Sequence, residues 1–227
     1  MRWKLAVTLG QLLFLSNTAV GQKDSVPQPT TDHTLVRKWI APVGIAASVA
    51  LDPEVREWTL REHTRTLDRL AKSVNPLGTA QHLVSAMAIT YASALLTNHE
   101  SLASGTLEAA AAYIASDLAE SALKPMIGRE RPDVEGNSRR FHPFTGNGDW
   151  HSLPSAHVAH ITSIATAVAM QTQSTPITAV CSALVAAMAW DRVYEDQHWT
   201  SDVTATIALT SVISSMTVRW LESRNHR

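Results

Sequence analysis

The stretch "SAHVAHITSIATAVAMQTQSTPITAVCSALVAAMAW", residues 155–190, contains no aspartate, glutamate, lysine or arginine. The polar, proline-containing segment 174–176 divides it into two apolar stretches of helical length. Much of both stretches is alanine, which favours helices packed closely against their neighbours. Helices joined by polar loops are also expected at 52–74, 79–98, 106–128 and 198–220. In the first of these, Asp52 would be the N-cap and Pro53 the first helical residue. With no strand-like alternation, the sequence predicts an all-α fold, a single helical bundle.

The N-terminal residues have the pattern of an export signal. A positively charged start, an apolar core at 5–15 and small residues shortly before position 22 predict a secretory signal peptide over residues 1–21. Residues 22–33 are polar and contain proline, which is typical of a flexible leader. The helical domain is then expected to cover residues 34–227. Secretion across the inner membrane, to the periplasm in a bacterium, follows from this interpretation.

The apolar stretches also raise the question of a membrane. They run about 14 to 16 residues and are diluted with serine and threonine, whereas a span needs roughly 20 mostly apolar residues. Glu108, Asp117 and Glu120 interrupt the helix expected at 106–128. The pattern therefore favours buried helices of a soluble domain. A membrane-associated protein stays as the alternative, because no charged residue lies between Asp149 and Asp191.

Composition excludes some classes of function. The formal net charge is −1, so there is no basic surface for nucleic acid. Cys181 is the only cysteine and has apolar neighbours, so we expect a buried, inert thiol and no intramolecular disulfide. The sequence does not predict the oligomeric state.

Charge returns in "DRVYEDQHWTSD", residues 191–202. His198 and Asp202 are four residues apart and would share one face of a helix. A carboxylate there can hold one ring nitrogen of the imidazole and leave the other free to react. Arg192, six residues before His198, could face the same pocket.

The long loop expected at 128–153 offers partners for these groups. "KPMIGRERP", 124–132, places Lys124 at a helix end and Arg131 seven residues later. One compact cation and one planar guanidinium suit a phosphoryl group. The other arginines of the loop are expected to be surface charges. They are Arg129, Arg139 and Arg140.

A third segment, "PSAH" at 154–157, is predicted to be a turn that leads into a helix. Free N–H groups at a helix start bind anions, and Ser155 adds a hydroxyl donor. His157, one turn into the helix, could protonate a leaving oxygen. A zinc site with His151 and His160 is the alternative. No cysteine or spaced carboxylate completes such a site nearby, so we favour phosphate and expect no metal or other cofactor.

Together these segments resemble the three motifs of the type 2 phosphatidic acid phosphatase superfamily, which also contains bacterial acid phosphatases and vanadium haloperoxidases. "KPMIGRERP" matches the first motif, "PSAH" the second and "DRVYEDQHWTSD" the third, in the family's order and spacing. The resemblance covers roughly residues 101–210. It implies a helical bundle and a metal-independent phosphatase for phosphate mono- or diphosphate esters, either lipid phosphates or small soluble esters.

The resemblance also implies a role for each matching residue. His198 would attack phosphorus and form a phosphohistidine, with Asp202 orienting it. His157 would protonate the leaving alcohol and then activate water. The remaining matching positions would bind the phosphate and stabilise the transition state. They are Lys124, Arg131, Ser155, Ala156 and Arg192.

Two positions depart from the family pattern. Ala156 replaces the usual glycine; it keeps the backbone N–H but adds a methyl group. Asp191 replaces the usual serine; it could pair with Arg192 and orient it, or it could weaken the local positive potential.

Two other functions remain alternatives: a vanadate-dependent haloperoxidase, and a non-catalytic phosphate- or lipid-binding relative. Contact with a membrane surface is possible for each.

Overall fold

The computed structural model describes residues 33–225 and is all-α in this part of the chain. Within these residues there are eight α-helices, two short 3₁₀ helices and no strand, so the predicted fold class is confirmed. The predicted signal peptide, residues 1–21, and all of the leader except its last residue lie outside the described residues.

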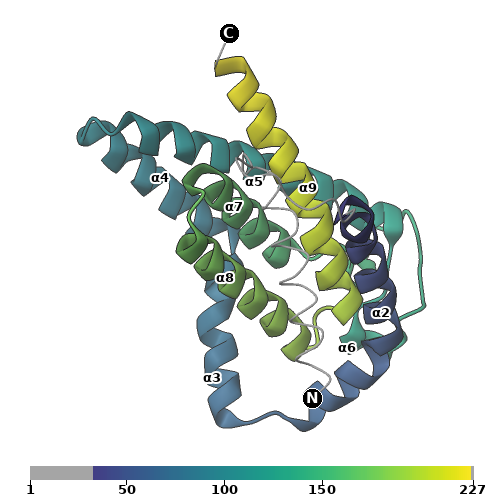
Figure 1. Cartoon of the computed structure of the whole chain (residues 1–227). Helices are drawn as coiled ribbons and strands as arrows, with labels where there is room; N and C mark the ends of the chain where they lie inside the picture. The colour runs from purple at the N-terminus through teal and green to yellow at the C-terminus, as the bar shows by residue number, and fades with distance from the viewer. Residues whose placement is uncertain (1–32, 226–227) are drawn as a thin grey trace.

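The helices follow one another with short connections, except for the loop after α5 (Figure 1). In chain order the elements are α2 (His33–Arg61), α3 (Arg65–Val74), η2 (Asn75–Gly78), α4 (Ala80–Leu96), α5 (Glu100–Ile127), α6 (Pro132–Glu135), η3 (Gly148–Trp150), α7 (Ala156–Thr172), α8 (Thr175–Tyr194) and α9 (Thr200–Asn225).

Helix α7 is the centre of the bundle and packs against α5, α8 and α9 (Figure 1). Four of the five alanines on α7 are almost fully buried, which lets these neighbours approach closely. The main core cluster joins α7, α8 and α9 through side chains such as Val158, Met188 and Ile207. Helix α2 packs against α9, and α4 packs against α5. The charged segment between α8 and α9 therefore lies at the same end of the bundle as the start of α7.

The prediction that one helix begins at residue 52 and runs to residue 74 is wrong. Helix α2 continues through Pro53 to Arg61, and a separate helix, α3, begins at Arg65. The cap at that second start is Thr64, whose side chain accepts a hydrogen bond from the N–H of Leu67. Asp52 is therefore not a helix cap. It is 1% exposed, so its carboxylate needs partners elsewhere in the fold.

Polarity is distributed unusually between the inside and the outside of the bundle. The interior contains many buried serine and threonine side chains, for example Thr162, Thr166 and Ser214. Several of these hydroxyls donate a hydrogen bond to the carbonyl oxygen one helical turn earlier, as Thr204 does to Thr200 at 2.8 Å. Large apolar side chains are instead exposed on α4, α5, α8 and α9. In the described residues one helix, α8, is long and apolar enough to cross a membrane, and half of its apolar window is buried.

Candidate active site

Three segments that are distant in sequence meet at one end of the bundle: the end of α5 with its following loop, the start of α7, and the connection from α8 to α9. Gly128 ends α5 with a left-handed φ of 60°. A side chain there would overlap the carbonyl oxygen of His142, so glycine is needed both for the turn and for the close approach. This turn directs the loop back across the start of α7, where the N–H of Ser152 donates to the carbonyl of Arg129 at 3.0 Å.

His198 is held in one tautomer by the backbone. Its Nδ1 lies 2.5 Å from the carbonyl oxygen of Ser152, and a carbonyl can only accept. Nδ1 therefore carries the proton, and Nε2 keeps its lone pair. Burial, together with nearby cations, lowers the pKa of His198 well below its usual value, so the ring is neutral at pH 7. A neutral imidazole with a free Nε2 is a nucleophile.

Asp202 lies beside His198, but its closest contacts are with other groups. Its Oδ2 is 4.0 Å from Nδ1 of His198, whereas it accepts hydrogen bonds from the Ser152 hydroxyl at 2.5 Å and the Trp199 N–H at 2.9 Å. The predicted direct hydrogen bond from the His198 ring to Asp202 is therefore absent; Ser152 contacts both residues instead, the ring through its carbonyl and the carboxylate through its hydroxyl. The reason is that α9 begins at Thr200, so His198 precedes the helix and its ring turns towards Ser152.

Arg129 is a component of the site that the sequence interpretation missed. We expected a surface charge, but the residue is 3% exposed, so that prediction is wrong. Its guanidinium donates to Asp202 Oδ1 at 2.5 Å, to Asp52 Oδ2 at 2.8 Å and to the carbonyl of Ser138. Burial raises the pKa of both carboxyls, and Arg129 opposes that shift.

His157 lies in the first turn of α7 and is half-buried. Burial is the largest cause that lowers its pKa to about 4, followed by the charge of Arg192 and smaller contributions from Lys124 and Arg131. The same three cations lower the pKa of His198. The two histidines therefore share one positive surrounding. The structure thus brings together the cations that the sequence assigned to a phosphate.

The start of α7 also carries an unused donor. Ser155 is fully buried, and no described residue is a hydrogen-bond partner of its Oγ. Its backbone N–H is already taken by Thr206 Oγ1 at 2.9 Å. Ala156 is the first residue of α7, where N–H groups have no acceptor inside the helix. The hydroxyl of Ser155 and the N–H groups from Ala156 onwards are therefore suited to an anion.

The three predicted phosphate-binding cations differ in what they contact. Among residues 33–225, Arg131 donates only to neutral oxygens, namely the carbonyls of Gly148 and Gln197 and the side-chain oxygen of Gln197. Lys124 Nζ is 2.9 Å from a carboxylate oxygen of Glu120. Arg192 Nε donates to Asp191 Oδ2 at 2.7 Å. Two of the three cations therefore contact a buried carboxylate.

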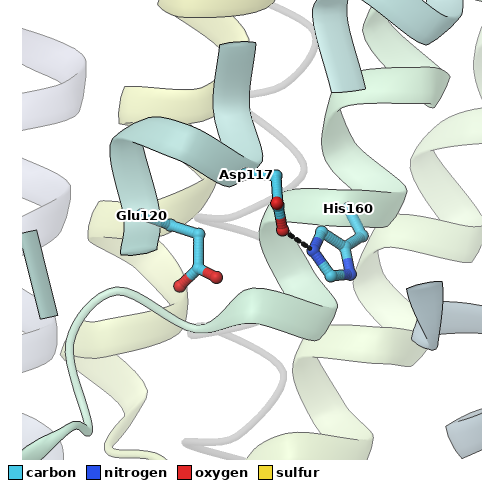
Figure 2. Close-up of side chains that lie close together, drawn as sticks. All are labelled: Asp117, Glu120 and His160. Atoms are coloured by element: carbon cyan, nitrogen blue, oxygen red, sulfur yellow. Dashed lines mark hydrogen bonds and ion pairs between the residues drawn. The ribbon is translucent and has the colours of Figure 1, made fainter. Parts of the chain in front are cut away.

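Next to Lys124, the side chains of Asp117, Glu120 and His160 form a cluster with metal-ligand chemistry (Figure 2). Their ligand atoms lie within 4.8 Å of one another. His160 Nε2 contacts Asp117 at 2.8 Å, and its Nδ1 lies 3.1 Å from the carbonyl of Gly78. Because Glu120 contacts Lys124 and Asp117 contacts His160, each ligand already has a partner, and we interpret the cluster as structural contacts of α5 and α7.

The other histidine considered for zinc, His151, contacts the carbonyl of Thr145 at 2.9 Å through its Nε2. The arrangement as a whole offers a neutral nucleophilic imidazole, a second neutral imidazole and three cations around them. It can bind an anion, attack it and move a proton to or from it without a metal.

Comparison with known proteins identifies the family of the chain and a protein of similar fold. A sequence model described as "PAP2 superfamily" matches residues 105–226. In fold, the chain is similar to a crystal structure described as the first transmembrane PAP2 type phosphatidylglycerolphosphate phosphatase from Bacillus subtilis. The TM-score is 0.62 at 15% sequence identity, and the match covers 96% of each chain. No curated protein matches the sequence.

Proposed function

Because the chain belongs to the PAP2 superfamily, we propose that it is a phosphatase that hydrolyses phosphate mono- or diphosphate esters through a phosphohistidine on His198. The observation that carries the proposal is the tautomer of that ring. Nδ1 is engaged by the carbonyl of Ser152, which leaves the Nε2 lone pair available beside Lys124, Arg131 and Arg192.

In the first step Nε2 of His198 attacks phosphorus, and the bond from phosphorus to the ester oxygen breaks. The departing oxygen takes a proton from His157. A bound phosphate supplies negative charge, which opposes the lowering of the His157 pKa and so favours the protonated form of the ring. In the second step His157 accepts a proton from water, the water oxygen attacks phosphorus, and His198 is released.

The remaining matching residues would stabilise charge on the phosphoryl oxygens. Lys124, Arg131 and Arg192 supply the cations, and Ser155 with the N–H groups near Ala156 supplies neutral donors. Asp202 would keep Ser152 in position, and Ser152 keeps the tautomer of His198.

Phosphate release in the presence of EDTA tests this proposal. The panel contains phosphatidic acid, a polyprenyl diphosphate and an aryl phosphate, each also given to His198→Ala. We expect release that EDTA leaves intact and that the substitution abolishes. His82→Ala, which changes an exposed histidine on α4, is the matched control and should keep full activity. A His198→Ala protein as active as its parent would refute the phosphohistidine. Halide oxidation that needs added vanadate would support the haloperoxidase instead.

We also propose that the protein is membrane-associated and that its substrate is a lipid phosphate. The exposed apolar side chains of α4, α5, α8 and α9 support this, because large apolar surfaces on soluble proteins are rare. The serine- and threonine-rich interior is typical of helices that associate within lipid. The test is flotation of the purified protein with phospholipid vesicles and the ranking of phosphatidic acid against the aryl phosphate. Failure to float, with the aryl phosphate preferred, would favour a soluble enzyme.

The proposed signal peptide, residues 1–21, would place this site outside the inner membrane. Mass spectrometry of the protein recovered from its native host tests that boundary. A chain that begins at residue 22 would support removal of the segment and export, and a chain that still begins at residue 1 would contradict removal.

A further inference from the structure

Two buried carboxylates contact cations of the proposed phosphate site. Glu120 is 5% exposed and lies one helical turn before Lys124 on α5. Asp191 is fully buried and precedes Arg192 at the end of α8. Asp191 Oδ2 accepts from Nε of Arg192 and lies 2.5 Å from its Nη2. Both carboxylates therefore engage the nitrogens that a phosphate would use.

Asp191 has little else to hold it in place. Its Oδ1 is buried without a hydrogen-bond partner among the described residues. A buried carboxylate oxygen left unpaired is costly, so contact with Arg192 is what compensates for the burial of Asp191. The family pattern has a serine at this position, and serine would leave Arg192 free.

These pairs change the charge that a ligand meets. The three proposed phosphate-binding cations are Lys124, Arg131 and Arg192, and the two carboxylates reduce their sum from three positive charges to one. Coulomb attraction scales with the charge of the ligand, so a weaker positive site loses more affinity for a dianion than for a monoanion.

We propose, on the basis of the phosphatase function above, that Asp191 and Glu120 are specificity-determining residues. They compete with the phosphate group for Arg192 and Lys124. The site consequently gives a dianion, such as a free monoester, a smaller advantage over a phosphate group that carries a single negative charge than three unpaired cations would give it.

Binding of two small anions tests the proposal. Dimethyl phosphate carries one negative charge, and inorganic phosphate is mostly a dianion at pH 8. Affinities are measured by isothermal titration calorimetry at pH 8 for the full chain in detergent. Removing one negative charge from the site should raise its affinity for dimethyl phosphate about threefold and its affinity for inorganic phosphate about tenfold, because inorganic phosphate carries twice the charge. The variants are Asp191→Asn and Asp191→Ser.

Two further variants separate competition from a structural role. Glu120→Gln makes the same change on α5, so it carries the test if Asp191 variants fail to fold. Glu195→Gln removes an exposed carboxylate one turn after Asp191, and it should leave both affinities within about twofold because surface charges are screened. A circular dichroism melt of each variant confirms that it is folded.

Three results would overturn the proposal. If Asp191→Asn and Glu120→Gln weaken both anions equally, the carboxylates orient their cations and do not compete. If both affinities are unchanged, the carboxylates do not influence the site. If the wild-type protein binds neither anion, the phosphatase proposal itself fails, and this outcome is distinct from wild-type binding that the variants do not alter.

Discussion

Replacing Arg129 by methionine should be among the most destabilising changes in this protein. The guanidinium is 3% exposed and lies between two carboxylates that are themselves buried. It donates to Asp202 Oδ1 at 2.5 Å, to Asp52 Oδ2 at 2.8 Å and to the Ser138 carbonyl at 2.8 and 3.1 Å. Methionine has similar bulk and no charge, so the change removes the cation and leaves both carboxylates in place.

The magnitude follows from the partners that remain. Removing one member of a buried ion pair costs about 3–5 kcal/mol, because the other charge stays buried without compensation. Asp52 keeps two hydrogen bonds from Ser201, and Asp202 keeps those from Ser152 and Trp199, which limits the loss. For a domain of this size each kcal/mol lowers the melting temperature by about 2–4 °C. We expect Arg129→Met to melt about 10 °C below the parent.

Thermal unfolding followed by far-ultraviolet circular dichroism measures this shift. Arg139→Met, a change at an exposed arginine of the same loop, is the matched control and should melt within about 2 °C of the parent. Adding Asp52→Asn to Arg129→Met should recover about half of the loss, since one stranded charge is then removed. An Arg129→Met protein as stable as Arg139→Met, or a double variant less stable than Arg129→Met, would refute the reasoning.

Three further substitutions test other parts of the site. The pKa of His157 is lowered to about 4, so the unfolded chain takes up a proton below pH 6.5 that the folded protein takes up only near pH 4. The free energy of unfolding should therefore decrease as the pH falls from 6.5 to 4. In urea titrations, His157→Asn should make this decrease smaller by about 1 kcal/mol, a value that allows for the partial exposure of the ring. Gly128→Ala should cost about 2–4 kcal/mol in the same titrations, because φ is 60° and the new Cβ would meet the His142 carbonyl. In Gly78→Ala the new Cβ would lie 2.9 Å from Cβ of His157, so kcat should fall about tenfold. The melting temperature should change little, since the two other close atoms, Cε and Sδ, are the flexible end of Met188.

The parts of the candidate site that could be predicted are those whose residues lie close together in the sequence. Lys124 with Arg131, the turn at Ser155, and Arg192 with His198 each lie within a few residues of one another, and each set falls at a helix end. Helix ends lie at the two ends of a bundle, and it was the resemblance to the three family motifs that led us to expect these segments to meet at the same end. The structure adds the electrostatic consequence, since the same cations lower the pKa of both histidines.

Contacts over long sequence separations could not be predicted in this way. Asp52 precedes a proline, which is a strong local signal for a helix start, and that signal misled the interpretation of α2. Its true role depends on Arg129, 77 residues later, and on Ser201, 149 residues later. Arg129 carried no pattern that separated it from its exposed neighbour Arg139. Only the fold determines which arginine of the loop is buried.

The same limit explains why average hydropathy gave an incomplete account of the helices. On α8 the exposed positions include Ile177, Val180 and Leu184, which recur at helical spacing, whereas Ser182 is buried and bonds the carbonyl of Thr178. A soluble helix would turn its large apolar stripe inward and its serine outward. A window average counts both kinds of position equally, so it cannot register this outward apolar stripe. The stripe supports the proposed membrane association, because in an acyl-chain environment large apolar side chains face lipid and small and hydroxyl side chains pair inside.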